Sequence, residues 1–326
     1  MKQQKKGIFC VSLDFEMFWG MQDAVPLSEY GENVVKGRQQ GFRQLKLFEQ
    51  YGIHATWGTV GMLLAKDKTQ LLQYIPEKKP SYHLARRNPY RQMETLGETA
   101  EESPYYYARD LVDAVLNTKD QELGSHTFSH YFCTEAGQTP EEFRADLEAA
   151  VTIGKDTAYA PVSLVFPRNQ SADEYAKVAA DCGFICYRGE EDNWIYRHIH
   201  KEFWLRAWRM LDSYFPLTGH NCHRIARRNG LIDIPGSAFL RPYKPSLRLL
   251  EGLKMARVRS QMRYAAKHGL VYHLYWHPHN LGAYAEQSFK QQEKLFQYFL
   301  KLNKKYGFES LNMREAAELF LKEEKR

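Results

Sequence analysis

The chain has 326 residues, of which 44% are hydrophobic and 26% are charged. These proportions indicate a soluble globular protein that is long enough to bury a substantial core. The net charge of +6 is small, and the basic residues are interspersed with acidic ones. We therefore expect no nucleic-acid partner.

Cysteine usage and the N-terminal segment bear on the location of the protein. The five cysteines are an odd number without the spacing of a disulfide framework, which indicates free thiols in a reducing compartment. After a basic segment, only the short apolar run from Ile8 to Leu13 precedes Asp14. This pattern is neither a signal peptide nor a membrane span, so we expect a cytoplasmic protein.

Strand and helix patterns alternate along the start of the chain. We expect a buried strand over 8–13, a helix over 34–51 that ends at Gly52, a strand over 54–60 and a short helix to residue 65. This order implies parallel pairing of the strands. Residues 66–108 contain several prolines and many charges, and we expect an insertion of loops and short helices there.

The alternation resumes after this insertion. We expect helices over 107–118, 140–154, 171–182, 245–268 and 284–305 and from residue 313, and strands into residue 126 and over 162–166, 184–187, 231–235, 270–276 and 308–311. A second irregular insertion covers 190–230. The pattern favours one α/β domain over residues 1–326, and a barrel over an open sheet, although periodicity alone leaves both arrangements possible.

Two histidines, His126 and His130, follow the predicted strand that ends at Ser125. If this segment is helical, their spacing places both imidazoles on one face, where they could bind one divalent ion. The alternative is a pair of ordinary surface or core histidines.

Polar side chains also follow the carboxyl ends of other predicted strands. They are Asp14 and Glu16, Arg168 and Asn169, and His277 with His279. In a parallel α/β barrel these strand ends open on one face, where active sites are assembled. We therefore predict a single site that combines these residues with the two histidines.

The acidic pair offers two complementary roles. Asp14 and Glu16 are two residues apart and point to the same side of an extended chain. One could complete a metal site and the other could accept a proton from water. The alternative is that both acidic residues only cap a helix or form surface ion pairs. Arg168 could keep the carboxylate that acts as general base ionised, or it could form an ordinary salt bridge. His277 comes first after its strand, and we favour it over His279 as general acid.

The order of these motifs resembles that of the polysaccharide deacetylases, also called the NodB-homology or carbohydrate esterase family 4 domain. The resemblance runs from about Gly7 to Leu319, and residues 124–130, Gly-Ser-His-x-x-x-His, are its most specific match. Residues 12–16 resemble the first family motif, 166–170 a later motif with Arg and Pro in changed order, and 274–278 the last. Asp192-Asn193-Trp194 is a loose match to the Asp-rich fourth motif.

The resemblance implies a deformed (β/α)7 barrel and a metal-assisted hydrolysis that removes an N-acetyl group from a sugar and releases acetate. The implied catalytic residues are Asp14 as base, His277 as acid, and Arg168. Glu16, His126 and His130 would bind the divalent metal, for which we expect zinc. In the alternative assignment, Asp14 is the metal ligand and Glu16 is the base. The expected saccharide contacts are Trp19, Asn169, Trp276 and His279, with a sugar that is free, nucleotide-linked or lipid-linked.

Other functions compete with this one. A hydrolase of a non-sugar C–N bond, such as a cyclic ureide, would use the same barrel, and a glycan-binding module would keep the fold without the metal.

A helical face across the second insertion predicts packing on the barrel or contact with a membrane surface; its residues are Trp204, Trp208, Leu211 and Phe215. We expect no second metal site at the remaining histidines, whose spacing matches no zinc motif; they are His198, His200, His220 and His223.

Overall fold

A computed structural model describes residues 5–190 and 203–325, with the backbone alone at 203–207. The strands are β1 (Ile8–Phe15), β2 (Ala55–Thr59), β3 (Gln121–Ser125), β4 (Ser163–Val165), β5 (Cys186–Arg188), β6 (Ala226–Arg228), β7 (Leu231–Asp233), β8 (Ala238–Phe239), β9 (Val271–Trp276) and β10 (Glu309–Ser310). The α-helices are α1 (Leu27–Tyr51), α2 (Lys68–Leu72), α3 (Arg109–Asn117), α4 (Pro140–Asp156), α5 (Asp173–Asp181), α6 (Phe203–Asp212), α7 (Glu251–His268), α8 (Ala285–Tyr306) and α9 (Met313–Glu324). Short 3-10 turns are η1 (Gly61–Leu64), η2 (Ala85–Arg87), η3 (Pro89–Glu94), η4 (Pro167–Asn169), η5 (Pro245–Leu247) and η6 (Pro278–Leu281).

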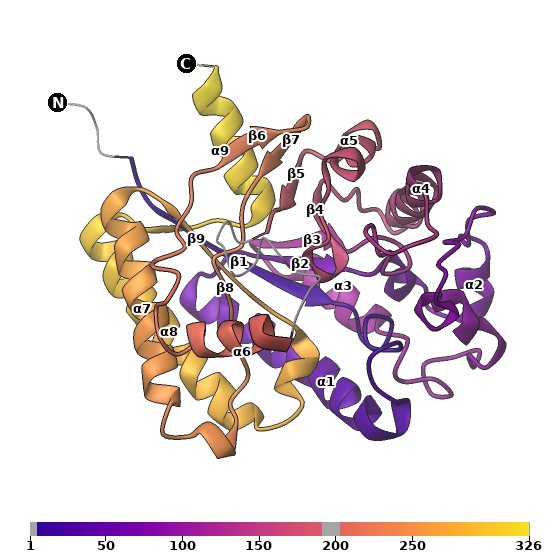
Figure 1. Cartoon of the computed structure of the whole chain (residues 1–326), viewed down its shortest axis with the longest axis horizontal. Coiled ribbons are helices and arrows are strands. Elements are labelled where there is room, and N and C mark those ends of the chain that lie inside the picture. Colours follow the sequence, from indigo (N-terminus) through magenta and orange to yellow (C-terminus); the bar gives the residue numbers. More distant parts are fainter. Residues whose placement is uncertain (1–4, 191–202, 326) are drawn as a thin grey trace.

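The strands form one curled sheet in the order β6-β7-β5-β4-β3-β2-β1-β9-β8, with β10 beside β1. Neighbouring strands are parallel along this order from β7 to β8, and β6 pairs antiparallel with β7. Figure 1 shows the strands in the centre, with α1, α7 and α8 along one side and α4 and α5 along the other. This is the deformed (β/α) barrel that the sequence predicted.

The strand register aligns the carboxyl ends of the central strands. Phe15 is opposite Thr59, Thr59 is opposite Ser125, and Val165 is opposite Arg188. Residues that follow these positions therefore emerge at one edge of the sheet, as the strand-end pattern required.

β1 pairs with β2 and β9, and all eight of its residues are buried because helices cover one face and the barrel interior covers the other. Its side chains alternate, and Phe9, Leu13 and Phe15 pack in the core between sheet and helices. Ser12 and Asp14 face the opposite way, into the barrel, where Arg188 donates hydrogen bonds to both. Strand periodicity thus delivers the polar residues of β1 to the barrel interior.

Most predicted elements are present, and the differences have local causes. α1 begins at Leu27, earlier than predicted. The prediction began at residue 34 because the first turns are only partly buried and carry little apolar pattern before Val34. Residues 66–108 form loops with α2, η2 and η3, as predicted. The very short strands β6 and β8 were not predicted. None of the described helices is both long and apolar enough to span a membrane.

Candidate metal and catalytic site

Glu16, His126 and His130 bring three ligand atoms within 4.8 Å of one another, and all three residues are buried. Oε2 of Glu16 lies 2.9 Å from Nε2 of His130 and 3.4 Å from Nε2 of His126. The Nδ1 atom of His126 lies 2.8 Å from the carbonyl oxygen of Val165, whereas its buried Nε2 has no hydrogen-bond partner. A ligating histidine typically uses its second nitrogen in this way, so these residues fit a divalent metal ion.

A loop, and not a helix, carries the two histidines. The helix that we considered after Ser125 was therefore wrong. Thr127 and His130 have φ angles of 63° and 61°, in the left-handed region that a helix excludes. The loop nevertheless brings the two imidazole rings to a centroid separation of 5.0 Å. The spacing in sequence was therefore informative although the local conformation was different.

The electrostatics of this cluster keep its groups ready to bind a cation. Burial lowers the pKa of His130 below its ordinary value, and a neutral imidazole is the form that binds a metal. For Glu16, burial would raise the pKa, but the neighbouring His277 and His130 together hold it well below the ordinary range. The cluster thus offers a carboxylate oxygen and imidazole nitrogens, which are donor atoms that suit a divalent ion.

Asp14 lies beside this cluster and forms a bidentate ion pair with Arg188. Two guanidinium nitrogens of Arg188 donate to its two carboxylate oxygens, at 2.6 Å and 2.8 Å. Burial would raise the pKa of Asp14, but the charge and hydrogen bonds of Arg188 lower it to about 2. Asp14 is therefore held as an oriented carboxylate.

Arg188 is itself fixed from several directions. The Oδ1 atom of Asn169 accepts from its Nε and from one terminal nitrogen, at 3.2 Å and 2.9 Å. Its guanidinium carbon lies 4.2 Å from the centre of the Tyr275 ring. Arg188 ends β5 and directly follows the strand predicted over 184–187, so the strand-end pattern used for the other residues also points to it, although the prediction left it out.

Arg168 does not make the contact that was expected of it. It donates to both carboxylate oxygens of Asp23, at 2.6 Å and 2.7 Å, and its guanidinium lies 4.4 Å from the centre of the Phe132 ring. Arg168 and Asn169 both have left-handed backbone angles. At this turn Asn169 points toward Arg188, whereas Arg168 points toward Asp23. The partner of Asp14 is therefore Arg188, and the prediction for Arg168 was wrong.

His277 borders both carboxylates and remains accessible. Its Nε2 lies 3.6 Å from Oδ2 of Asp14 and 3.8 Å from Oε1 of Glu16, and its side chain is 26% exposed. His279 stacks against it at 4.9 Å and is buried, and burial together with His277 lowers the pKa of His279 to about 3. Of the two histidines, His277 is the one that a substrate could reach.

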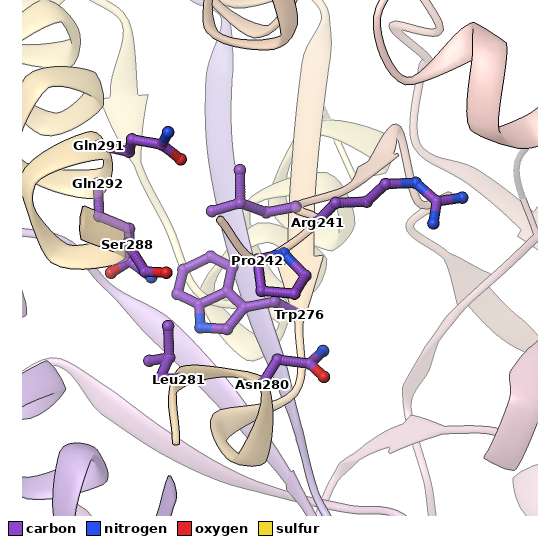
Figure 2. A pocket seen from close by; sticks show the side chains of 9 residues that line it. Arg241, Pro242, Trp276, Asn280, Leu281, Ser288, Gln291 and Gln292 are labelled. Carbon is purple, nitrogen blue, oxygen red and sulfur yellow. The ribbon is translucent and has the colours of Figure 1, made fainter. Parts of the chain in front are cut away.

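Neither predicted tryptophan offers a ring face to a sugar, because Trp19 and Trp276 are each 1% exposed. The Trp19 indole N–H donates to the carbonyl oxygen of Tyr106 at 2.9 Å. Figure 2 shows the Trp276 ring beside Pro242 and Leu281, in a pocket that Ser288, Gln291 and Gln292 of α8 line from the other side. Because side chains alternate along β9, Tyr275 faces the barrel and Trp276 faces away from it. These two expected saccharide contacts were wrong.

The remaining expectations concern the second insertion. Asp192, Asn193, Trp194, His198 and His200 lie outside the described residues. His220 stacks on Tyr264 with 4.0 Å between ring centroids, and neither it nor His223 belongs to a three-ligand group within 5–190 and 203–325. A second such group in that part of the chain is His54, Asp120 and Glu315. There, Nδ1 of His54 forms a 2.7 Å ion pair with Glu315.

Comparisons with known proteins give structural matches alone. No protein-family model matches the chain, and no curated protein matches its sequence. A Mycobacterium smegmatis protein assigned as a polysaccharide deacetylase has a TM-score of 0.61 at 13% identity, over 99% of this chain and 93% of its own. A Pseudomonas aeruginosa PAO1 protein with the same assignment has a TM-score of 0.56 at 13% identity, over 95% and 89%.

The chain has the fold of the polysaccharide deacetylases. The Puue allantoinase has a TM-score of 0.57 at 13% identity, over 98% of this chain and 91% of its own, so the polysaccharide deacetylase fold is shared with a second kind of enzyme. At such low identity the likeness is one of fold, and fold alone assigns no substrate. The function has to be argued from the site.

Proposed function

We propose that this chain is a metal-dependent deacetylase that removes an N-acetyl group from an N-acetylated sugar of a surface glycan or its precursor and releases acetate. The observation that carries the proposal is the buried Glu16–His126–His130 group beside an arginine-paired carboxylate and an accessible histidine. These three kinds of group are what amide hydrolysis at a metal centre requires. We further propose that residues 1–326 form one catalytic domain with insertions at 66–108 and 190–230.

Glu16, His126 and His130 would hold the metal, and zinc is the ion that their donor atoms suit best. A divalent ion bound there would polarise the amide carbonyl and lower the pKa of a water molecule. Asp14 accepts the proton of the attacking water at a carboxylate that Arg188 keeps ionised and oriented. His277 donates a proton from Nε2 to the departing amine, since it is the exposed member of the group.

The direct test is acetate release from a panel of N-acetylated saccharides that are free, nucleotide-linked and lipid-linked, with and without a chelator. We expect chelator-sensitive acetate release from at least one of them. His126→Ala should reduce the rate by about 100-fold or more and lower the zinc content below one ion per chain. Full activity in the presence of chelator, or an unchanged zinc content in the variant, would contradict the proposal.

The second candidate function is hydrolysis of a cyclic ureide. We consider it because the chain is similar in fold to an allantoinase. The same panel extended to cyclic ureides separates the two activities. A chain that hydrolyses neither class and binds no zinc would instead support the non-catalytic glycan-binding alternative. Saccharide binding by that chain, measured by calorimetry, would then be the expected positive result.

We also propose a cytoplasmic location and a peripheral membrane contact. All five cysteines are free, which suits a reducing compartment. On and just beyond α6, Trp208, Leu211 and Phe215 are 43%, 42% and 43% exposed, as an interfacial surface requires. Flotation with anionic vesicles tests the contact, with Trp208→Ser/Leu211→Ser as the matched control. Absence of the wild-type protein from the vesicle fraction would remove this idea.

A further inference from the structure

The two histidines of the metal group are held in different ways. His126 follows β3 directly, its backbone N–H donates to the carbonyl oxygen of Thr59 at 2.8 Å, and its Nδ1 lies 2.8 Å from the carbonyl oxygen of Val165. Nδ1 of His130 is buried and has no hydrogen-bond partner among the described residues. The ring of His130 contacts Glu16 through Nε2 and packs edge-on against Phe132, but no hydrogen bond fixes its second nitrogen. Its placement therefore depends more on the backbone that carries it than that of His126 does.

That backbone is unfavourable on its own. Thr127 and His130 both have left-handed φ angles, which residues with a Cβ atom rarely adopt. Such a conformation persists only where surrounding contacts impose it. On one side the loop is fixed to η1, because Gly61 and Met62 donate backbone hydrogen bonds to the carbonyl oxygens of Thr127 and Phe128, at 2.8 Å and 3.0 Å.

On the other side the loop is fixed by one buried carboxylate, that of Asp146 in α4. Oδ1 of Asp146 accepts from the backbone N–H of Phe128 at 2.7 Å. Oδ2 accepts from the backbone N–H of Ser129 at 3.1 Å and from the Ser129 hydroxyl. Asp146 is 1% exposed, so water cannot replace these bonds. The carboxylate satisfies donors on the two residues that directly precede His130.

We propose that Asp146 is a positioning residue that holds the metal ligand His130 in register with Glu16 and His126. The inference rests on the proposed metal site. Asp146 acts on His130 through its hydrogen bonds to residues 128 and 129. Of the side-chain types, only a carboxylate of this length presents two acceptor oxygens to three donors without adding a donor of its own.

The test is the zinc affinity of full-length Asp146→Asn, measured at pH 8 by competition with a chromophoric chelator. In this variant one oxygen becomes an NH2 group that faces an N–H donor, so the loop shifts. We expect the Kd for zinc to rise roughly 10- to 100-fold, as for other residues that support a ligand, while one zinc ion still binds at saturation. With cobalt in place of zinc, the visible absorption bands should change as well.

Asp181→Asn is the matched control, because Asp181 is an exposed aspartate that pairs with Arg144 far along the chain from the loop. It should leave the Kd unchanged. Should Asp146→Asn fail to fold, Ser129→Ala decides, because it removes one donor and keeps both backbone bonds. A weaker zinc affinity in Ser129→Ala supports the proposal.

The outcomes separate the two proposals. If the wild-type protein binds zinc and Asp146→Asn, or Ser129→Ala in its place, binds it equally tightly with the same cobalt spectrum, the positioning role is overturned and the metal site stands. If the wild-type protein binds no zinc, the proposed metal site itself is overturned. A lower melting temperature of Asp146→Asn with an unchanged Kd would show a purely structural role and would overturn the inference.

Discussion

Arg188 determines the state of Asp14, and its bidentate geometry can be tested. Arg188→Lys keeps the positive charge but cannot bond both carboxylate oxygens in parallel. We expect kcat to fall roughly 10- to 100-fold with a smaller change in KM, because a misoriented proton acceptor affects the chemical step. The measurement is steady-state kinetics on the saccharide found to release acetate.

The matched control for this prediction is Arg168→Lys at the rim. Arg168 pairs with Asp23 and is 35% exposed. A partly exposed ion pair contributes at most about 1 kcal/mol to stability. Arg168 pairs with Asp23 and not with Asp14 or Glu16, so we expect Arg168→Lys to leave kcat nearly unchanged. A larger loss of kcat in Arg168→Lys than in Arg188→Lys would reverse our assignment of the two arginines.

Gly20 leaves the space that the Glu16 carboxylate occupies. A Cβ atom at residue 20 would lie 2.2 Å from Cδ of Glu16 and 2.3 Å from Oε2, closer than atoms can approach. Gly20→Ala therefore has to displace a carboxylate that His130 and His126 also contact. We expect the Kd for zinc to rise about 10-fold or more, measured by chelator competition.

Gly252→Ala is the corresponding control, because nothing lies within 4 Å of a Cβ atom at residue 252 in α7. It should leave zinc affinity unchanged and, at a helical position, stabilise the protein slightly. Equal zinc affinities in the two alanine variants would mean that the Glu16 carboxylate has room to move, or that it is not a ligand.

At the scale of elements, α9 is joined to the amino-terminal ends of the strands by a buried carboxylate. Glu122 in β3 accepts from the Thr56 hydroxyl at 2.7 Å, from the Ser163 hydroxyl and from the backbone N–H of Arg314 at 3.1 Å. Burial raises its pKa above the ordinary value of 4.5, although these hydrogen bonds oppose the rise. The folded state therefore holds a proton on Glu122 more tightly than the unfolded state does.

The sign of the resulting pH dependence follows from linkage. A raised pKa in the folded state contributes stability below the ordinary carboxyl range, and this stability is lost as the pH rises through the raised value. Each tenfold difference in proton affinity is worth about 1.4 kcal/mol. We expect Glu122→Gln to match the wild type near pH 4 and to exceed it increasingly at higher pH, in free energy of unfolding from urea titrations.

Glu148→Gln, at an exposed position of α4, is the control for this measurement. Its free energy of unfolding is measured over the same pH range as that of Glu122→Gln. If the difference in free energy of unfolding between Glu122→Gln and the wild type does not change with pH, burial does not shift the proton affinity of the Glu122 carboxylate.

At the scale of the whole molecule, metal binding should stabilise the fold. The proposed ligands come from β1 and from the loop after β3, so a bound ion joins segments that are distant in sequence. An ion that binds only the folded state stabilises it by about 2.7 kcal/mol at a free concentration of 100 times the Kd. We expect the melting temperature in calorimetry to rise by a few degrees when zinc is added to chelator-treated protein. His126→Ala should show no such rise, and an equal rise would place the zinc elsewhere.

The sequence by itself was sufficient for the alternation of strands and helices and for the location of polar residues at strand ends. Both depend on local periodicity, which a single chain displays directly. The segment from Ile8 to Leu13 is almost entirely apolar, which is the pattern of a strand buried on both faces, and the observed strand continues through Asp14 to Phe15, just before Glu16. The pairing of His126 with His130 was also visible as a spacing.

Only the tertiary structure decided which distant side chains meet. Arg168 and Arg188 both lie at strand ends, and nothing in their local sequence tells which one reaches Asp14. The left-handed turn at 168–169 and the register of β5 decide it. Likewise, Trp276 and Tyr275 differ in which face of β9 they occupy, and the curl of the sheet makes one face the barrel interior. Contacts between segments far apart in sequence depend on register and loop geometry, which periodicity does not encode.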